Sequence, residues 1–163
     1  MQGNSKPGRN PAVAARPLAD LLECPPEAGT LLTGAAECLS VEAGDTAFHQ
    51  DDACKGLYLV VSGEFLRRSE RLNTHITLGT VRPGDLVELA AALGDCHHTY
   101  TMTALTPGNL LLLPMSALHQ AFDHHPPLRM HLLEELAREV SRAYRSCSLS
   151  RPVPARRVGA SLQ

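Results

Sequence analysis

Residues 57–65 read LYLVVSGEF, and this stretch decides the fold class. Aliphatic and aromatic residues that favour strands run from Leu57 to Val61, and Gly63 then marks a turn. The segment VRPGDLVELA at residues 81–90 has a similar form, because a strand ends near Val81 and Pro83-Gly84 follow as turn residues. Both segments therefore predict short strands that end in sharp turns.

The same rhythm extends outward from these segments, from residue 41 to residue 115. Short apolar or alternating runs are separated by Gly, Pro, Asp and Asn about every ten residues. The stretch at 31–41, which precedes these segments, is ambiguous: it is a short helix or turn, followed by a strand that begins at Cys38. The expected strands are 46–49, 57–62, 64–69, 76–81, 99–105 and 110–113. About seven or eight short strands at this spacing predict a β-sandwich or barrel.

Helical patterns flank the strands on both sides. Leu18, Leu21 and Leu22 form a short helical stripe that stops at Pro25-Pro26. After residue 115, Ser116 is a candidate N-cap for a helix that ends near His124. An amphipathic helix of about 20 residues then follows. Its apolar stripe recurs every four residues, at Leu128, Leu132, Leu136, Val140 and Tyr144.

The composition indicates one globular domain of 163 residues, with 44% hydrophobic residues and a net charge of −2. We expect a flexible tail at 1–16, one domain at 17–147 (barrel about 36–115, C-terminal helices about 116–147) and a second tail at 148–163. No signal sequence and no membrane-length apolar run of about 20 residues are found, so we expect a cytoplasmic protein. The cysteines are interpreted as ordinary thiols because no pair has C-x-x-C spacing: Cys24, Cys38, Cys54, Cys96 and Cys147.

Gly44-Asp45, LYLVVSG at 57–63 and Pro83-Gly84-Asp85 occur in an order and at a spacing that resemble the cyclic nucleotide-binding domain of the CRP/FNR superfamily. The resemblance covers about residues 30–146. It implies a mainly β fold: a double-stranded β-helix (jelly-roll) barrel with short N-terminal helices and a long C-terminal helix. It also implies a sensor module with a small nucleotide-like ligand, and a homodimer that forms through the leucine stripe of the long helix.

The phosphate-binding cassette of that family implies a set of site residues in the segment after Asp85. The family uses a Gly-Glu pair, an arginine ten residues after the glutamate, and then a small hydroxyl residue. Glu88 and Thr99 match the glutamate and the hydroxyl residue, but Val87 replaces the glycine and His98 the arginine. Leu89 and Ala90 complete the candidate ligand-binding set. Because a histidine is mostly neutral at pH 7 and lacks the forked guanidinium, we expect weak or no binding of cyclic AMP or cyclic GMP.

Other interpretations remain open at this stage. The chain is either a genuine cyclic nucleotide receptor that uses Glu88 and Thr99, or the effector part of a transcription regulator lacking its helix-turn-helix. Glu88 is alternatively a solvated or capping carboxylate, and His97-His98 are ordinary loop residues. Neighbours on a strand point to opposite faces, so this histidine pair does not predict a shared metal ion.

An enzyme is the weakest class, because His49, His75 and His119 are scattered and show no metal-ligand spacing. The sequence therefore predicts a non-enzymatic module without a cofactor or metal. We also expect no direct DNA binding by this chain, since no DNA-recognition helix follows the long amphipathic helix. The lack of a membrane-length apolar run leads us to expect no membrane insertion.

Overall fold

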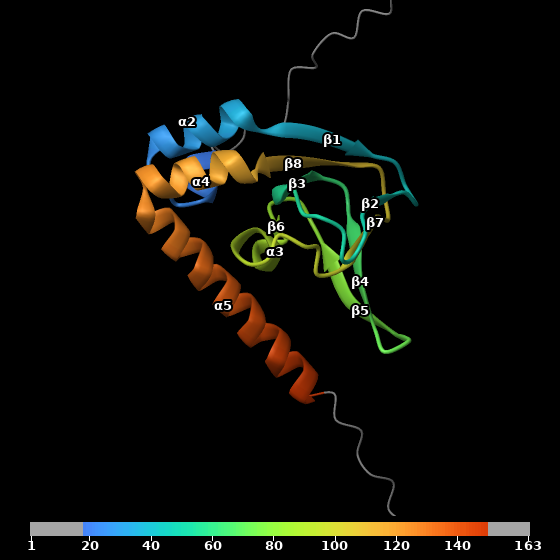
Figure 1. Ribbon diagram of the computed structural model, residues 1–163. Coiled ribbons are helices and arrows are strands. Elements are labelled where there is room, and N and C mark those ends of the chain that lie inside the picture. Colours follow the sequence, from blue (N-terminus) through green and yellow to red (C-terminus); the bar gives the residue numbers. More distant parts are fainter. Residues whose placement is uncertain (1–17, 150–163) are drawn as a thin grey trace, which may run out of the picture.

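The computed structural model describes residues 18–149, and side chains up to Arg145 (Figure 1). The helices are α1 Leu18–Leu21, α2 Pro26–Ala35, α3 Leu89–Leu93, α4 Met115–His124 and α5 Pro126–Leu149. The strands are β1 Glu37–Val41, β2 Thr46–Phe48, β3 Gly56–Ser62, β4 Phe65–Arg71, β5 Thr74–Val81, β6 Leu86–Val87, β7 Thr101–Ala104 and β8 Gly108–Pro114.

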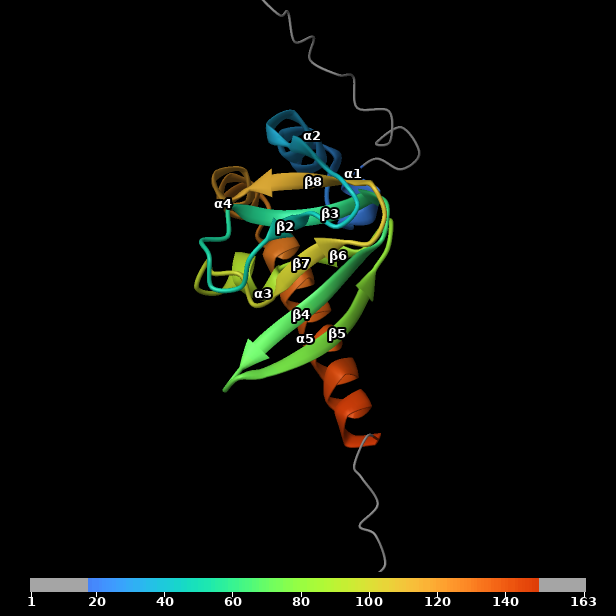
Figure 2. The same cartoon turned by 90° about the vertical axis from the view of Figure 1, so that its right-hand side faces the viewer.

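Two four-stranded antiparallel sheets form the barrel, in the orders β1-β8-β3-β6 and β2-β7-β4-β5. Helices α2 and α4 lie beside β8 at one end of the barrel, and α5 leads away from them past α3 (Figures 1 and 2). This arrangement confirms the jelly-roll fold class, with short N-terminal helices and a long C-terminal helix.

Strands β3 and β8 are buried on both faces, and this explains their continuous apolar sequence. Leu57 and Leu111 belong to a helix-side core that α1, α2, α4 and α5 complete. Tyr58 and Leu112, which pair across the two strands, belong instead to a barrel core between the sheets. A strand with only one buried face would alternate apolar and polar residues. The continuous apolar runs at 57–61 and 110–113 follow from this burial on both faces.

The turns follow the glycines of the sequence. Gly63 adopts a φ of +85° between β3 and β4, and a Cβ atom there would lie only 2.7 Å from the Cα of Gly108. Gly84 has a φ of +96° in the turn before β6. Both positions lie in the left-handed region, which favours glycine. The turn predictions at Gly63 and Gly84 are confirmed.

Several element boundaries differ from the sequence-based expectations. The ambiguous stretch at 31–41 contains the end of α2, which begins at Pro26, and then the whole of β1. The predicted N-cap Ser116 is wrong, since α4 begins at Met115 with Pro114 in the N-cap position. Pro114 is also the last residue of β8 and makes no side-chain capping hydrogen bond, so α4 begins where the strand ends and not at a capping side chain. The predicted strand at 99–105 is shorter, and only 101–104 pair as β7.

The apolar stripe of α5 divides into two parts. Leu128 and Leu132 are buried in the helix-side core, and Leu136 packs partly against it. Val140 is 60% exposed and Tyr144 is 75% exposed. Figure 2 shows this end of the helix extending beyond the barrel. Leu128 and Leu132 therefore stabilise their own domain and are not available for the predicted dimer surface.

Helix α5 runs to Leu149, slightly past the expected domain end at residue 147. The predicted tail at 1–16 lies outside the described residues, as does the second tail from residue 150 onward. Among the described helices, none combines the length and apolar character that a membrane span requires.

Candidate ligand site in the barrel interior

Glu88 is the central residue of the candidate site. It lies in the turn between β6 and α3, and its backbone adopts a left-handed conformation with a φ of 71°. The side chain is 0% exposed and points into the barrel core. It makes no capping hydrogen bond to α3, although it occupies the N-cap position. The alternatives of a solvated or capping carboxylate are therefore wrong, because Glu88 is a buried acid.

Thr99 satisfies the Glu88 carboxylate from the segment that precedes β7. The Thr99 hydroxyl donates to Glu88 Oε1 at 3.0 Å, and the Thr99 backbone N–H donates to Oε2 at 3.2 Å. The Glu88 backbone N–H in turn donates to the hydroxyl of Tyr100 at 3.3 Å. The two groups that match the ribose-binding and phosphate-binding positions of the family therefore bind each other.

His98 lies on the other side of the carboxylate. Its Nδ1 is 3.4 Å from Glu88 Oε2, and its side chain is 2% exposed. The imidazole stacks on Phe48, with ring centroids 3.9 Å apart and an interplanar angle of 7°. His97 is exposed, and its Nδ1 lies 2.9 Å from the carbonyl oxygen of Asp95. The two histidines thus differ, and the interpretation of His98 as an ordinary loop residue is wrong.

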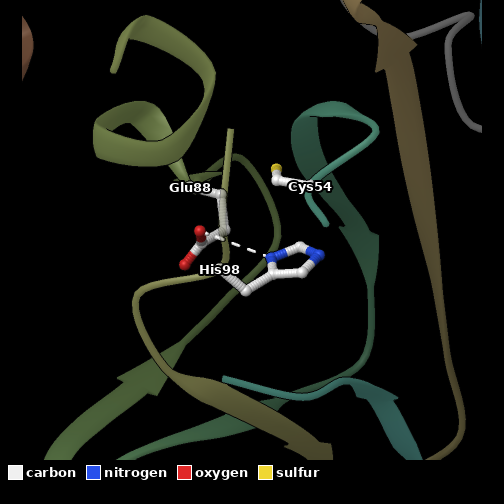
Figure 3. A group of neighbouring side chains, drawn as sticks. All are labelled: Cys54, Glu88 and His98. Carbon is white, nitrogen blue, oxygen red and sulfur yellow. Dashed lines mark ion pairs between the residues drawn. The ribbon is translucent and has the colours of Figure 1, made fainter. Parts of the chain in front are cut away.

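Cys54 completes this group of buried polar side chains (Figure 3). Its thiol donates to the carbonyl oxygen of Gly56 at 3.0 Å, and burial raises the pKa of this thiol to about 11. One potential ligand atom from each of Cys54, Glu88 and His98 lies within 4.8 Å of the others. Sequence reasoning missed Cys54, because only tertiary pairing brings it to this place: Ala53 bridges to His97, and the Cys54 backbone N–H donates to the carbonyl oxygen of Cys96 at 2.8 Å.

The remaining cassette residues have structural positions. Val87 pairs with Tyr58 in β6 and is buried in the barrel core. Leu89 is buried in the helix-side core, and Ala90 is exposed. Val87 and Leu89 fill space, and α3 is a helix of only five residues. The cassette segment therefore folds as a small packing unit.

A groove of about 430 Å³ lies outside the barrel core, against α5. Its lining includes Arg67, Leu89 and Glu139, but none of Glu88, His98 and Thr99. Arg67 Nη1 donates to Glu139 Oε1 at 3.2 Å and so links β4 to α5. The Arg67 guanidinium also lies 5.5 Å from the ring centroid of Tyr100. This groove and the buried group around Glu88 are therefore separate features, with Tyr100 between them.

The two antiparallel sheets, the short β6–α3 segment with an inward-facing glutamate, and the long terminal helix together define a cyclic nucleotide-binding type of regulatory barrel. The chain belongs to the cyclic nucleotide-binding domain family, whose model matches residues 38–125. This membership and the structural neighbours confirm the resemblance to CRP/FNR effector domains.

Two solved structures illustrate the likeness. The catabolite activator protein of Thermus thermophilus is 26% identical, with a TM-score of 0.67 over 82% of this chain and 62% of that one. The N-terminal domain of a transcriptional regulator from Streptomyces coelicolor A3(2) is 28% identical, with a TM-score of 0.57 over 85% of this chain and 91% of that one.

A much longer relative also matches. Lysophospholipase NTE1 of Eremothecium gossypii is 30% identical over 107 residues, which are 64% of this chain but 7% of that protein. The chain therefore spans only a small part of this relative, and 62% of the Thermus protein.

Proposed function

We propose that this chain is a non-enzymatic regulatory module of the CRP/FNR effector type whose barrel does not bind cyclic AMP or cyclic GMP tightly. The observation that carries the proposal is the mutual bonding of Glu88 and Thr99 beneath the His98–Phe48 stack. The groups with which the family would hold a nucleotide are engaged with each other: Glu88 is buried, and the exposed Thr99 bonds to it from the segment before β7.

The cost of opening this core supports the proposal. A ribose hydroxyl would have to replace the Thr99 donors at Glu88, and hydrogen bonds to a charged group contribute about 1.5–3 kcal/mol each. Displacing the His98–Phe48 stack would cost about another 0.5–1.5 kcal/mol. The cyclic phosphate would then meet His98 in place of a guanidinium, and so would lack a permanent forked cation.

Isothermal titration calorimetry of the full chain with cyclic AMP and cyclic GMP tests this proposal. We expect no saturable heat at nucleotide concentrations up to the millimolar range, at pH 7.5 and at pH 6. Micromolar binding of either nucleotide at pH 7.5 would overturn the proposal. Binding that appears only at the lower pH would instead favour a genuine receptor in which a protonated His98 holds the phosphate.

We further propose that the exposed end of α5 pairs with a second copy of this chain. Val140 and Tyr144 continue the apolar stripe of Leu136 beyond the barrel, at a spacing that suits a helix-to-helix contact. Sedimentation velocity on the full chain is expected to show a dimer that Val140→Glu converts to monomer. Even a weak specific dimer is populated at about 100 μM, so a wild-type chain that stays monomeric at that concentration would contradict this.

A further inference from the structure

Among the described residues, no lysine or arginine forms an ion pair with the buried Glu88 carboxylate. A carboxylate in a protein interior is strongly destabilised unless a cation or sufficient hydrogen-bond donors compensate it. Thr99 supplies two donors, and His98 faces the remaining side at 3.4 Å. Within the described part of the chain, His98 Nδ1 is nevertheless one of the buried polar atoms without a hydrogen-bond partner. The Cys54 thiol lies beside both groups.

We propose that Cys54, Glu88 and His98 form a mononuclear Zn²⁺ site inside the barrel. This inference deepens the proposed function, on which it rests, because it assigns a metal ion to the core that a nucleotide does not enter. Thiolate, imidazole and carboxylate are the three ligand types that Zn²⁺ uses in proteins. All three side chains are almost completely buried, so water would compete only weakly for them.

The distances fit this coordination. Zn–N and Zn–O bonds of about 2.0–2.1 Å in a tetrahedron place the nitrogen and oxygen about 3.4 Å apart. The separation of His98 Nδ1 and Glu88 Oε2 is 3.4 Å. Each of the three residues offers one ligand atom within 4.8 Å of the other two, and tetrahedral zinc places sulfur about 3.6 Å from nitrogen or oxygen, so the sulfur needs to move inward by at most about 1.2 Å. That movement would replace its hydrogen bond to the Gly56 carbonyl oxygen with a bond to the metal.

The charges balance in the bound state. The thiol of Cys54 loses its proton to solvent as the Zn–S bond forms, and no electron is transferred. One thiolate, one carboxylate, a neutral imidazole and one Zn²⁺ then sum to zero, which suits an apolar core. Three protein ligands leave the fourth position of the tetrahedron to a ligand from outside the chain.

Neighbouring residues already hold two of the ligands in place. Thr99 fixes the Glu88 carboxylate with two hydrogen bonds, and Phe48 fixes the plane of the His98 ring by stacking. Such supporting contacts orient metal ligands and tune affinity. Of the three ligands, only the Cys54 thiol therefore has to change its contacts when the metal binds.

Cobalt titration of the full chain, stripped with EDTA, tests the site. Co²⁺ is expected to bind 1:1 and to give a thiolate-to-metal charge-transfer band together with the visible bands of tetrahedral cobalt. Zn²⁺ should then bleach both. Cys54→Ser and His98→Gln are expected to abolish the charge-transfer band or lower the affinity at least about tenfold. The matched controls are Cys96→Ser and His97→Gln. Both residues pair through their backbone with the segment around Cys54, but neither belongs to the proposed ligand set, so the spectrum should stay unchanged.

X-ray absorption at the zinc edge of the wild-type complex keeps the proposal falsifiable if a variant does not fold. One sulfur together with nitrogen and oxygen neighbours supports the site. A shell without sulfur, or with two or more sulfurs, overturns it, as does the absence of any charge-transfer band with Co²⁺ in the folded chain. The nucleotide titration is read separately: a chain that binds neither metal nor nucleotide defeats the zinc site alone and leaves the proposed function intact.

Discussion

The two parts of α5 should respond very differently to the same kind of truncation. Leu132 is 1% exposed in the helix-side core, whereas Val140 lies eight residues further along the same stripe and is 60% exposed. Leu132→Ala removes buried methyl groups and leaves a cavity, and Val140→Ala removes mostly solvated ones. We therefore expect Leu132→Ala to destabilise the fold and Val140→Ala to leave it almost unchanged.

The magnitudes follow from the burial of each side chain. A buried Leu→Ala change costs about 2–5 kcal/mol, whereas an exposed substitution falls within about 0.5 kcal/mol of zero. A loss of about 3 kcal/mol at an m-value of about 2 kcal/mol/M lowers the urea midpoint by about 1.5 M. Urea unfolding followed by circular dichroism, at two protein concentrations, measures this. The Val140→Ala midpoint should lie within about 0.3 M of the wild type at the lower concentration.

Two results would refute this reasoning. A cost below about 1 kcal/mol for Leu132→Ala would mean that the start of α5 does not pack on the barrel. A loss above about 2 kcal/mol for Val140→Ala, equal at both protein concentrations, would place Val140 inside the monomer fold. A loss for Val140→Ala that appears only at the higher concentration belongs instead to the proposed dimer, because only dimer stability depends on concentration.

Two further predictions concern the barrel core. Thr99→Val removes the hydroxyl donor to the buried Glu88 carboxylate and should lower the free energy of unfolding by about 1.5–3 kcal/mol. The control Thr103→Val removes a hydroxyl that contacts only the uncharged Thr46 hydroxyl, at 3.4 Å, and should cost less than about 1 kcal/mol; equal effects in urea unfolding would contradict the network. In EDTA at pH 8, iodoacetamide should modify the exposed Cys38 and spare Cys54. Cys54 is buried, and burial raises the pKa of its thiol to about 11, so little thiolate is present at this pH. Peptide mass spectrometry that finds both cysteines equally modified would contradict this.

Much of the fold could be predicted from the sequence because its determinants are local. Glycines with positive φ and strands buried on both faces leave direct marks in the order of residues. β6 and α3 left no such mark, because a strand of two residues and a helix of five are too short for any periodicity. The start of α2 at Pro26 was missed for another reason. A proline can end one helix and begin the next, and only packing decides which.

The candidate site was predictable only in part. The family spacing located Glu88, His98 and Thr99, but it could not show that they contact one another. Cys54 precedes His98 by 44 residues and carries no motif. Its position depends on the pairing of Ala53 with His97. Contacts of this kind arise from tertiary structure, and a single sequence does not encode them in a readable pattern.

The substitution of His98 for an arginine changes more than the charge of the site. An arginine is long enough to reach outward to a phosphate, whereas the short imidazole lies flat on Phe48 and closes the core.

The closed core still contacts α5 through a continuous series of side chains. The Glu88 backbone donates to Tyr100, whose ring lies under the Arg67 guanidinium, and Arg67 pairs with Glu139 on α5. A change in the backbone at Glu88, such as one caused by a metal ion, therefore acts on Tyr100. Two contacts, Tyr100 to Arg67 and Arg67 to Glu139, connect Tyr100 to α5. If the barrel does not hold a nucleotide, as we propose, this series of contacts still links its interior to the terminal helix.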